Sequence, residues 1–427
     1  MNAHSASAPA RLSGADMRTL GLSALGGALE FYDFIIFVYF VVVLGNLFFP
    51  PGIPDWLVQL QAFGIFAAGY LARPLGGIVL AHFGDRLGRK RMFTLSIFLM
   101  AISTFGIACL PTFATIGHAA PILLLVMRVL QGAAIGGEVP GAWVFVSEHV
   151  ARRRVGLACG ILTAGLTAGI LLGALVATAI NRGFSPQEIH DYAWRIPFAL
   201  GGVFGFCAVY LRSWLAETPV FQEMKARKEL SHALPLAVVL RHHLKAVSVS
   251  MLLTWLLSAS IVVVILMTPT LLQTRYGIPA PTALTANSFA TFFLTVGCIT
   301  TGFLCDALGA RRVLAFGSVG LAAAAGAFFY LVPTRPDLLL PLYSLAGLLV
   351  GMISVVPFIM VRAFPPAVAF SGVSFSYNVS YAVFGGLTPL LVTLALQVDP
   401  MAHAHYVLAL CAAGLVLSFL LPKSAPT

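Results

Sequence analysis

Between two long apolar segments stands the charged sequence GDRLGRKR, residues 84–91. A related sequence, CDALGARR, occupies residues 305–312 and again follows a long apolar segment. Each copy contains an aspartate, a glycine three residues later and a basic cluster, which is typical of a short charged turn between two helices. The two copies predict a chain made of two similar halves, in which each turn follows the second helix of its half.

The composition places this chain in a lipid bilayer. Its residues are 59% hydrophobic and 9% charged, whereas an ordinary soluble domain carries roughly a quarter charged residues. The apolar runs reach the roughly 20 residues that a helix needs to cross a bilayer. We therefore expect an all-α membrane protein with twelve transmembrane helices in two pseudo-symmetric six-helix bundles. The expected helices lie near residues 20–46, 59–83, 92–112, 120–147, 155–181, 195–214, 246–273, 283–305, 313–332, 338–361, 369–397 and 403–422.

The longest polar segment, residues 215–245, lies between the sixth and seventh expected helices. We interpret it as a cytoplasmic linker between the two halves. The six-helix bundles then occupy residues 20–214 and 246–422, with cytoplasmic tails at residues 1–19 and 423–427.

The formal net charge of +10 follows the expected topology. The segments expected outside contain only Arg182, Arg195, Arg275 and Arg335. Two further arginines, Arg73 and Arg128, fall within predicted spans, and the remaining basic residues lie in segments expected inside. Because basic residues of membrane proteins concentrate on the cytoplasmic side, we expect both termini in the cytoplasm, insertion in a bacterial inner (plasma) membrane, and no nucleic-acid partner.

The sequence has no pattern of a metal or catalytic site. All six cysteines lie in apolar segments without a CxxC spacing, which argues against a metal centre and against a disulfide framework. The histidines are scattered, and we find neither a nucleophile motif nor a phosphate-binding loop. We expect a protein that is not an enzyme and that requires no metal or cofactor.

The charged turns are candidates for a conformational latch. Gly88 can adopt backbone conformations that other residues resist, and Asp85 is expected at the start of the third helix, where an acid complements the positive helix terminus. The arginines can pair with acids on neighbouring helix ends. An ordinary positively charged cytoplasmic loop is the alternative. The expected latch residues are Asp85, Arg86, Gly88, Arg89, Glu148 and Asp306.

The first turn resembles the signature loop of the major facilitator superfamily, and other motifs are similar to its metabolite:proton symporter branch. These motifs are EFYDF at residues 30–34, ARPLGG at 72–77, RVLQG at 128–132, GGE at 136–138, WRIPF at 194–198 and ETP at 217–219. The resemblance extends over residues 21–421. It implies a transporter that works as a single chain and imports carboxylates such as citrate and 2-oxoglutarate, or zwitterions such as proline and betaine. Since Ala307 and Ala310 replace basic residues of the first turn, we expect a weaker latch in the second half.

Two acids in the first helix are candidate proton carriers. Glu30 and Asp33 lie three residues apart on one helical face, and ionisable groups within a membrane tend to face a polar cavity. Burial favours the neutral form of a carboxyl group, whereas a nearby arginine favours the charged form. Alternatively, Glu30 caps the inner end of this helix and Asp33 pairs permanently with an arginine.

The fourth helix carries a polar stripe. At roughly 100° per residue, Arg128, Gln131 and Glu138 fall within an arc of about 80° and can face a common interior. A guanidinium there can bind a substrate carboxylate or neutralise Asp33, and a structural pair with Glu138 is the alternative. Arg73 is either a second anion ligand or a structural anchor. The expected proton-coupling residues are Asp33, Glu30, Arg128 and Glu138.

Hydrogen-bond donors replace charges in the spans of the second half. The eleventh helix contains Tyr377, Asn378 and Tyr381, and this pattern resembles that of carboxylate-importing relatives. Glycines and a proline downstream allow the helix to bend. The expected substrate contacts are Arg128, Arg73, Gln131, Tyr32, Tyr377, Asn378 and Tyr381.

Together these features predict a secondary active transporter that imports a small organic anion, such as a di- or tricarboxylate, by proton symport. The two halves rock around a central site to give alternating access. Proton-coupled import of a zwitterion such as proline or betaine, and export of a metabolite by proton antiport, are the alternatives.

Overall fold

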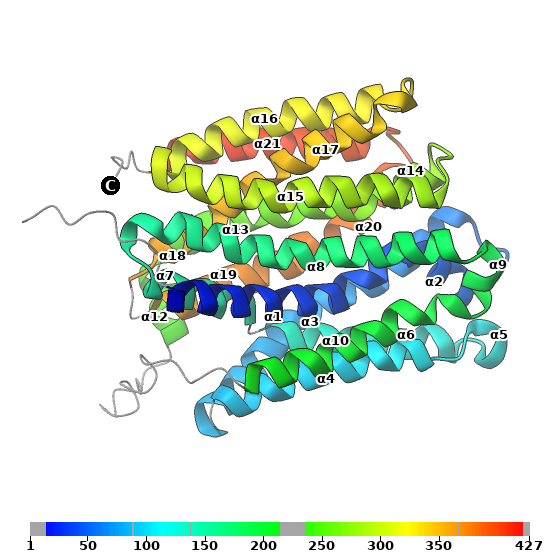
Figure 1. The fold of residues 1–427 in the computed structure, drawn as a ribbon, viewed down its shortest axis with the longest axis horizontal. Helices are drawn as coiled ribbons and strands as arrows, with labels where there is room; N and C mark the ends of the chain where they lie inside the picture. Colours follow the sequence, from blue (N-terminus) through cyan, green and yellow to red (C-terminus); the bar gives the residue numbers. More distant parts are fainter. Residues whose placement is uncertain (1–13, 88, 137, 214–234, 366–367, 422–427) are drawn as a thin grey trace, which may run out of the picture.

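The computed structural model describes residues 14–87, 89–136, 138–213, 235–365 and 368–421. Every regular element in these ranges is a helix, and the long helices run side by side along one axis of the molecule (Figure 1). A helix satisfies its own backbone hydrogen bonds, which apolar surroundings require. The expected all-α membrane architecture is confirmed.

The first half contains six long helical segments, some of them interrupted. They are α1 (Gly14–Tyr39) continued by α2 (Val41–Phe48), α3 (Asp55–Leu87), α4 (Arg89–Cys109), α6 (Ala119–Ile135) followed by α7 (Glu138–His149), α8 (Val155–Gly183), and α10 (Arg195–Ser213). Short connecting helices are α5 (Phe113–Ile116), η1 (Arg152–Arg154), α9 (Pro186–Glu188) and η2 (Ile189–Ala193).

The second half follows the same order of long segments. They are α13 (Leu244–Ser260) with η3 (Ile261–Met267) and α14 (Thr268–Thr274), α15 (Ala280–Leu308), α16 (Ala310–Leu331), α17 (Leu339–Val350) with η5 (Gly351–Ser354) and α18 (Val355–Ala363), α19 (Ala369–Ser380) with η7 (Tyr381–Gly385) and α20 (Gly386–Ala395), and α21 (Ala402–Leu420). The shorter helices α12 (Pro235–His242) and η4 (Pro336–Leu338) precede two of them.

Each of the twelve expected spans corresponds to one of these segments. Within the described ranges, nine segments are long and apolar enough to cross a membrane, or ten if the bent pair that ends in α10 counts as one span. The other two are α3 and α4, which are helical at the expected positions. The expected linker at residues 215–245 is described only from residue 235, where the helix α12 begins, so the division into bundles stays a prediction.

The helices are less regular than the sequence predicts. The seventh and eleventh segments each contain a π-helical stretch, Ile261–Met267 and Tyr381–Gly385, and the tenth contains the 3₁₀ turn Gly351–Ser354. Such π segments frequently occur at functional sites. The eleventh expected helix therefore departs from α-helical geometry at Tyr381, close to the glycines where a bend was predicted.

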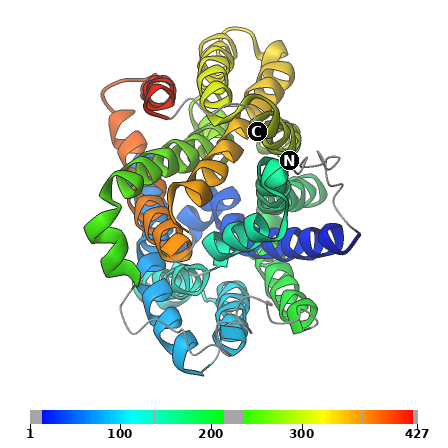
Figure 2. The same cartoon turned by 90° about the vertical axis from the view of Figure 1, so that its left-hand side faces the viewer.

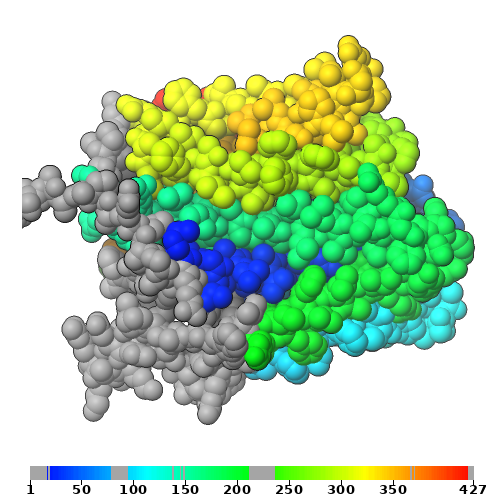
Figure 3. Space-filling model, in the orientation of Figure 1, coloured from blue at the N-terminus to red at the C-terminus, as the bar shows by residue number. Residues whose placement is uncertain are grey.

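Small residues bring the helix backbones into contact. A Cβ atom on Gly76 of α3 would overlap the Ala133 carbonyl oxygen of α6, and one on Gly160 of α8 would lie 2.9 Å from the Gly302 Cα of α15. Close approach through small residues is a common mode of helix association in membranes. Seen along the helices, the cyan helices lie on one side and the yellow helices on the opposite side (Figure 2), and α8 lies alongside α15 (Figure 3).

Different short helices lie at the two ends of the helix bundle. The beginning of α1 and the helices α7, α12 and α18 lie at one end, while α2, α9 and α14 lie at the other (Figure 1). Following the expected topology, we call the end with α12 the inner end and the end with α9 the outer end.

Candidate functional site

A buried arginine lies among aromatic rings from both halves. The guanidinium carbon of Arg73 on α3 lies 4.8 Å from the ring centre of Tyr381, 5.5 Å from that of Tyr70 and 5.6 Å from that of Tyr377. Tyr70 stacks on Tyr381 with 5.2 Å between ring centres. Arg73 is 1% exposed, and its Nε and Nη2 atoms have no hydrogen-bond partner among the described residues. We call Arg73, Tyr70, Tyr377 and Tyr381 the aromatic cage.

Two residues beside the cage join the halves. Trp143 of α7 packs edge-on against Tyr377, with 5.0 Å between ring centres. The side-chain amide of Asn378 donates to the backbone carbonyl of Gly136, at the end of α6. The Asn378 amide nitrogen is therefore occupied by an inter-half contact in this conformation, and its predicted role in substrate binding stays a prediction.

Arg128 on α6 lies fully buried behind the cage. Its Nη1 donates to Gln131 Oε1 at 2.8 Å and to the Phe34 carbonyl oxygen at 3.0 Å. The guanidinium carbon lies 4.4 Å from the centre of the Phe34 ring, and that of Arg73 lies 5.9 Å from the same ring. Arg128 and Gln131 thus share a buried face of their helix, as expected, and both arginines adjoin Phe34.

Asp33 on α1 does not pair with Arg128. Its carboxylate faces α10, because a Cβ atom on Gly201 would lie 2.7 Å from Oδ1 and one on Gly205 would lie 3.1 Å from Oδ2. Asp33 is 1% exposed, and neither oxygen has a hydrogen-bond partner among the described residues. A permanent ion pair between Asp33 and an arginine, which the sequence left open as an alternative, is therefore absent among the described residues. Glu30, one helical turn earlier, is also buried.

Tyr32 lies apart from the aromatic cage. Its hydroxyl donates to the Pro197 carbonyl oxygen at 2.8 Å, and its ring packs edge-on against Phe204 with 5.1 Å between ring centres. Both partners belong to α10, whereas the Phe34 ring faces Arg73 on α3. The structure therefore does not bring Tyr32 to the other predicted substrate contacts.

At the inner end, the second charged turn joins the two halves. Asp306 in the last turn of α15 accepts hydrogen bonds from the backbone N–H groups of Gly156 at 2.8 Å and Leu157 at 2.9 Å, in the first turn of α8. Nearby, Arg362 Nη2 of α18 donates to the Arg152 carbonyl oxygen at 2.8 Å. A carboxylate at a helix N-terminus is stabilised by the unpaired N–H groups and the helix dipole.

The first charged turn is only partly described. Asp85 lies within α3, which continues to Leu87, so the prediction that it begins the third helix is wrong: α4 begins at Arg89. The helix continues through Gly84, and Gly88 lies outside the described residues. The side chains of the following predicted site residues are not described, and their roles stay predictions: Asp85, Arg86, Arg89, Glu138 and Glu148.

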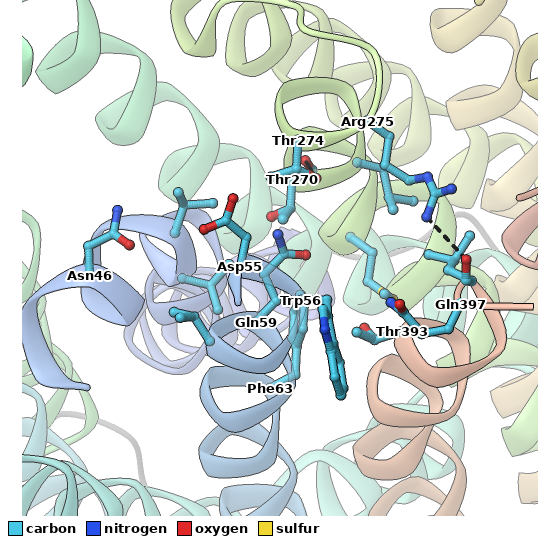
Figure 4. A pocket seen from close by; sticks show the side chains of 16 residues that line it. Asn46, Asp55, Trp56, Gln59, Phe63, Thr270, Thr274, Arg275, Thr393 and Gln397 are labelled. Atoms are coloured by element: carbon cyan, nitrogen blue, oxygen red, sulfur yellow. Dashed lines mark hydrogen bonds between the residues drawn. The ribbon is translucent and has the colours of Figure 1, made fainter. Parts of the chain in front are cut away.

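A cavity of about 510 Å³ opens at the outer end, between the halves. Its wall contains Asp55 and Trp56 of α3 on one side and Thr274 and Arg275, at the end of α14, on the other (Figure 4). Asp306 joins the halves at the inner end, and this cavity lies between them at the outer end, so we call the conformation outward-facing; the aromatic cage itself is buried.

Sequence reasoning missed several of these residues. Tyr70 lies three residues before Arg73 and shares its helical face, which is the one signal that predicts its place in the cage. Trp143 and Phe34 lie in apolar stretches, where an aromatic side chain usually packs against lipid or another helix. Asp55 lies at the start of a helix, where an acid is common.

The comparisons with known proteins decide the family. Residues 35–389 match the family model of the Major Facilitator Superfamily. The chain belongs to the major facilitator superfamily. It is 30% identical over 424 residues to the proline/betaine transporter of Salmonella typhimurium, covering 96% of this chain and 84% of that protein. It is also 30% identical over 421 residues to the ectoine/proline transporter ProP of Corynebacterium glutamicum, covering 94% and 83%.

Solved structures of the superfamily share the fold. The proton:xylose symporter XylE, bound to 6-bromo-6-deoxy-D-glucose, superposes with a TM-score of 0.76 at 16% identity and covers 96% of both chains. The family and the fold identify the protein as a multi-pass membrane transporter of the major facilitator superfamily, and not as an enzyme.

Proposed function

We propose that this transporter imports a small zwitterion of the proline or betaine type together with protons. The observation that carries the proposal is the aromatic cage, where Arg73 offers unpartnered N–H groups among three tyrosine rings contributed by both halves. A guanidinium binds a carboxylate through paired hydrogen bonds, and aromatic rings bind quaternary ammonium groups through cation–π contacts. One carboxylate and one cationic nitrogen match this combination.

The names of the relatives support a zwitterion in preference to a di- or tricarboxylate. They refer to proline, betaine and ectoine, each of which carries a single carboxylate. The Nη1 of Arg128 is bound to Gln131 and to the Phe34 carbonyl, but its Nε and Nη2 have no partner among the described residues, as in Arg73. The preference for a zwitterion therefore rests on these names and on the aromatic rings of the cage. The zwitterion, considered above as an alternative, thus replaces the organic anion as the proposed substrate.

Asp33 is the proposed proton carrier, with Glu30 as its partner on the same helix. An unpaired charge buried in apolar surroundings is strongly unfavourable, and no described group donates a hydrogen bond to the Asp33 carboxylate. The site therefore fits a carboxyl group that holds a proton in the outward-facing conformation. Release of this proton towards the inside is coupled to the rocking of the two halves.

Asp306 is the proposed inner latch, since it bonds α8 of the first half from α15 of the second half. We further propose that a single chain transports, in a bacterial plasma membrane, with both termini in the cytoplasm and a linker between two six-helix bundles. The positive-inside distribution of arginine and lysine supports this orientation.

The proposal is tested in proteoliposomes with a pH-sensitive dye on the outside. Adding betaine or proline should alkalinise the outer medium, and citrate should not. Arg73→Gln should abolish the signal, whereas the matched change Arg335→Gln, in an exposed ion pair with Asp337, should leave it intact. Alkalinisation with citrate alone, or acidification that indicates antiport, would overturn the proposal.

A further inference from the structure

The outer cavity is lined by polar and apolar groups, and none of the cage residues contributes to its wall. Asp55 and Phe63 of α3 both line it, whereas the cage begins at Tyr70 on the same helix. At about 1.5 Å per residue, Arg73 lies roughly 27 Å further along α3 than Asp55. A solute in the cavity near Asp55 is therefore too far away to contact the cage.

Two opposite charges face this cavity from different halves. Asp55 belongs to the first half, and its carboxylate has no hydrogen bond or ion pair with any described residue. Arg275 belongs to the second half, and its Nη1 donates to the Leu396 carbonyl oxygen at 3.3 Å (Figure 4). The two side chains do not form an ion pair with each other. They lie apart on the cavity wall, so a solute with a positive and a negative end can contact both.

The remaining walls suit the two ends of such a solute. Trp56, next to Asp55, is 40% exposed and lines the cavity with its indole ring, and tryptophan is the best of the aromatic rings for binding a cation. Gln397 lies on the side of Arg275 and offers an amide donor to a carboxylate (Figure 4), whereas the Thr274 hydroxyl donates to the Thr270 carbonyl oxygen at 2.8 Å. The cationic and the anionic ends thus have separate binding surfaces.

We propose that this cavity is a second, outer binding site for zwitterions, in which Asp55 and Trp56 hold the cationic end and Arg275 the carboxylate. The inference rests on the proposed function, because it assigns the same class of solute to a second place. Since both charges are exposed to water, ion pairing there is weak and screened by salt. The outer site binds the solute loosely before the solute reaches the cage. While the site is occupied, the bound solute bridges the two halves.

The test is equilibrium binding of radiolabelled betaine to the full-length protein in lipid nanodiscs, with uptake measured in parallel. Wild type should bind two betaines per chain, one of them weakly and in a salt-sensitive manner. Asp55→Asn and Arg275→Gln should each remove the weak site and raise the KM for uptake at least threefold, with a smaller change in the maximal rate. Trp56→Leu should weaken the site more than Trp56→Phe.

The matched control is Asp337→Asn. Asp337 is an exposed acid at the same end of the molecule, paired with Arg335 and outside the cavity. The substitution Asp337→Asn should leave both classes of betaine binding and the KM for uptake unchanged. A single binding class that Asp55→Asn and Arg275→Gln leave intact would overturn the outer site while the proposed function stands. Absence of betaine and proline binding altogether, without uptake, would overturn both.

Discussion

Removing the charge of Asp306 should shift the transporter from its outward-facing towards its inward-facing conformation. Asp306 accepts two backbone hydrogen bonds from the first turn of α8, at 2.8 and 2.9 Å. These bonds form only while α8 and α15 are in contact at the inner end. In Asp306→Asn, one side-chain oxygen remains as an acceptor, the second acceptor becomes an NH₂ group, and the negative charge at the helix N-terminus is lost.

The magnitude follows from these two bonds. Hydrogen bonds to a charged group contribute about 1.5–3 kcal/mol, and a charge at a helix end typically contributes about 0.3–1 kcal/mol. Since the substituted asparagine keeps one neutral hydrogen bond, we expect a net loss of about 1–2 kcal/mol from the outward-facing conformation. The ratio of inward- to outward-facing molecules should therefore rise by a factor of about 5–30.

The assay is the distance between two spin labels at the inner end. Cysteines at the exposed positions Arg153 and Arg312 carry the labels, in a background where the two exposed native cysteines, Cys109 and Cys207, are replaced by serine. Asp306→Asn should enlarge the population with the longer label distance. Asp337→Asn, at the outer end, serves as the control and should not change the distribution.

A second variant tests the same contact from the other side. A Cβ atom on Gly156 would lie 2.6 Å from Asp306 Oδ1 and 2.6 Å from the Gly302 carbonyl oxygen. Gly156→Ala should therefore separate the halves at the inner end and shift the distances in the same direction. If both variants keep the wild-type distance distribution and the wild-type melting temperature, Asp306 does not act as a latch.

Three other changes test the remaining assignments. Asp33→Asn should abolish accumulation of solute against a gradient and preserve counterflow of solute; accumulation at the wild-type level would exclude Asp33 as the carrier. Tyr381→Leu should raise the Kd for betaine roughly tenfold, as expected for the loss of about 1–2 kcal/mol of cation–π attraction, and Tyr381→Phe should raise it far less. Hydrogen bonds to its carboxylate hold the pKa of Asp399 below its usual range; the bond from the backbone N–H of Met401 has the largest effect, and the bond with the His405 side chain has the next largest. The charged Asp399 therefore stabilises the fold above its unfolded pKa of about 3.9. This stabilisation is lost as the pH falls through the lower pKa that Asp399 has in the folded protein. Below a pH of about 3.9, the melting temperature of Asp399→Asn should therefore vary less with pH than that of the wild type.

The architecture follows from the sequence because each span must be long and apolar, and such runs can be read directly. The interruptions do not follow from it. The π-helical stretch Tyr381–Gly385 lies in a continuous run without a break before Gly385, and a Cβ atom on Gly385 would meet the Tyr381 ring and Ser258. Contacts with neighbouring helices thus decide the local geometry there, and a single sequence contains no record of them.

The candidate site was only partly predictable for a related reason. Buried arginines are costly in a membrane and therefore conspicuous in the sequence, so Arg73 and Arg128 were identified. Their partners on other helices depend on how each helix is rotated about its axis, which turned Asp33 towards α10 and placed the Phe34 ring against Arg128. The outer cavity was missed because Asp55 and Arg275 are ordinary charged residues at helix ends, far apart in the chain.

Helix rotation also bears on how a proton and a substrate influence each other. The Asp33 carboxylate faces α10, while the ring of the next residue, Phe34, lies against both buried arginines. Arg128 donates to the Phe34 carbonyl, which ties α1 to α6 at this level. A carboxylate that gains or loses a proton changes how favourably α1 packs against α10, and any rotation of α1 moves Phe34 against Arg73. With Asp33 as the proposed proton carrier and the aromatic cage as the proposed substrate site, coupling needs no direct contact between Asp33 and the substrate, because α1 connects the two places.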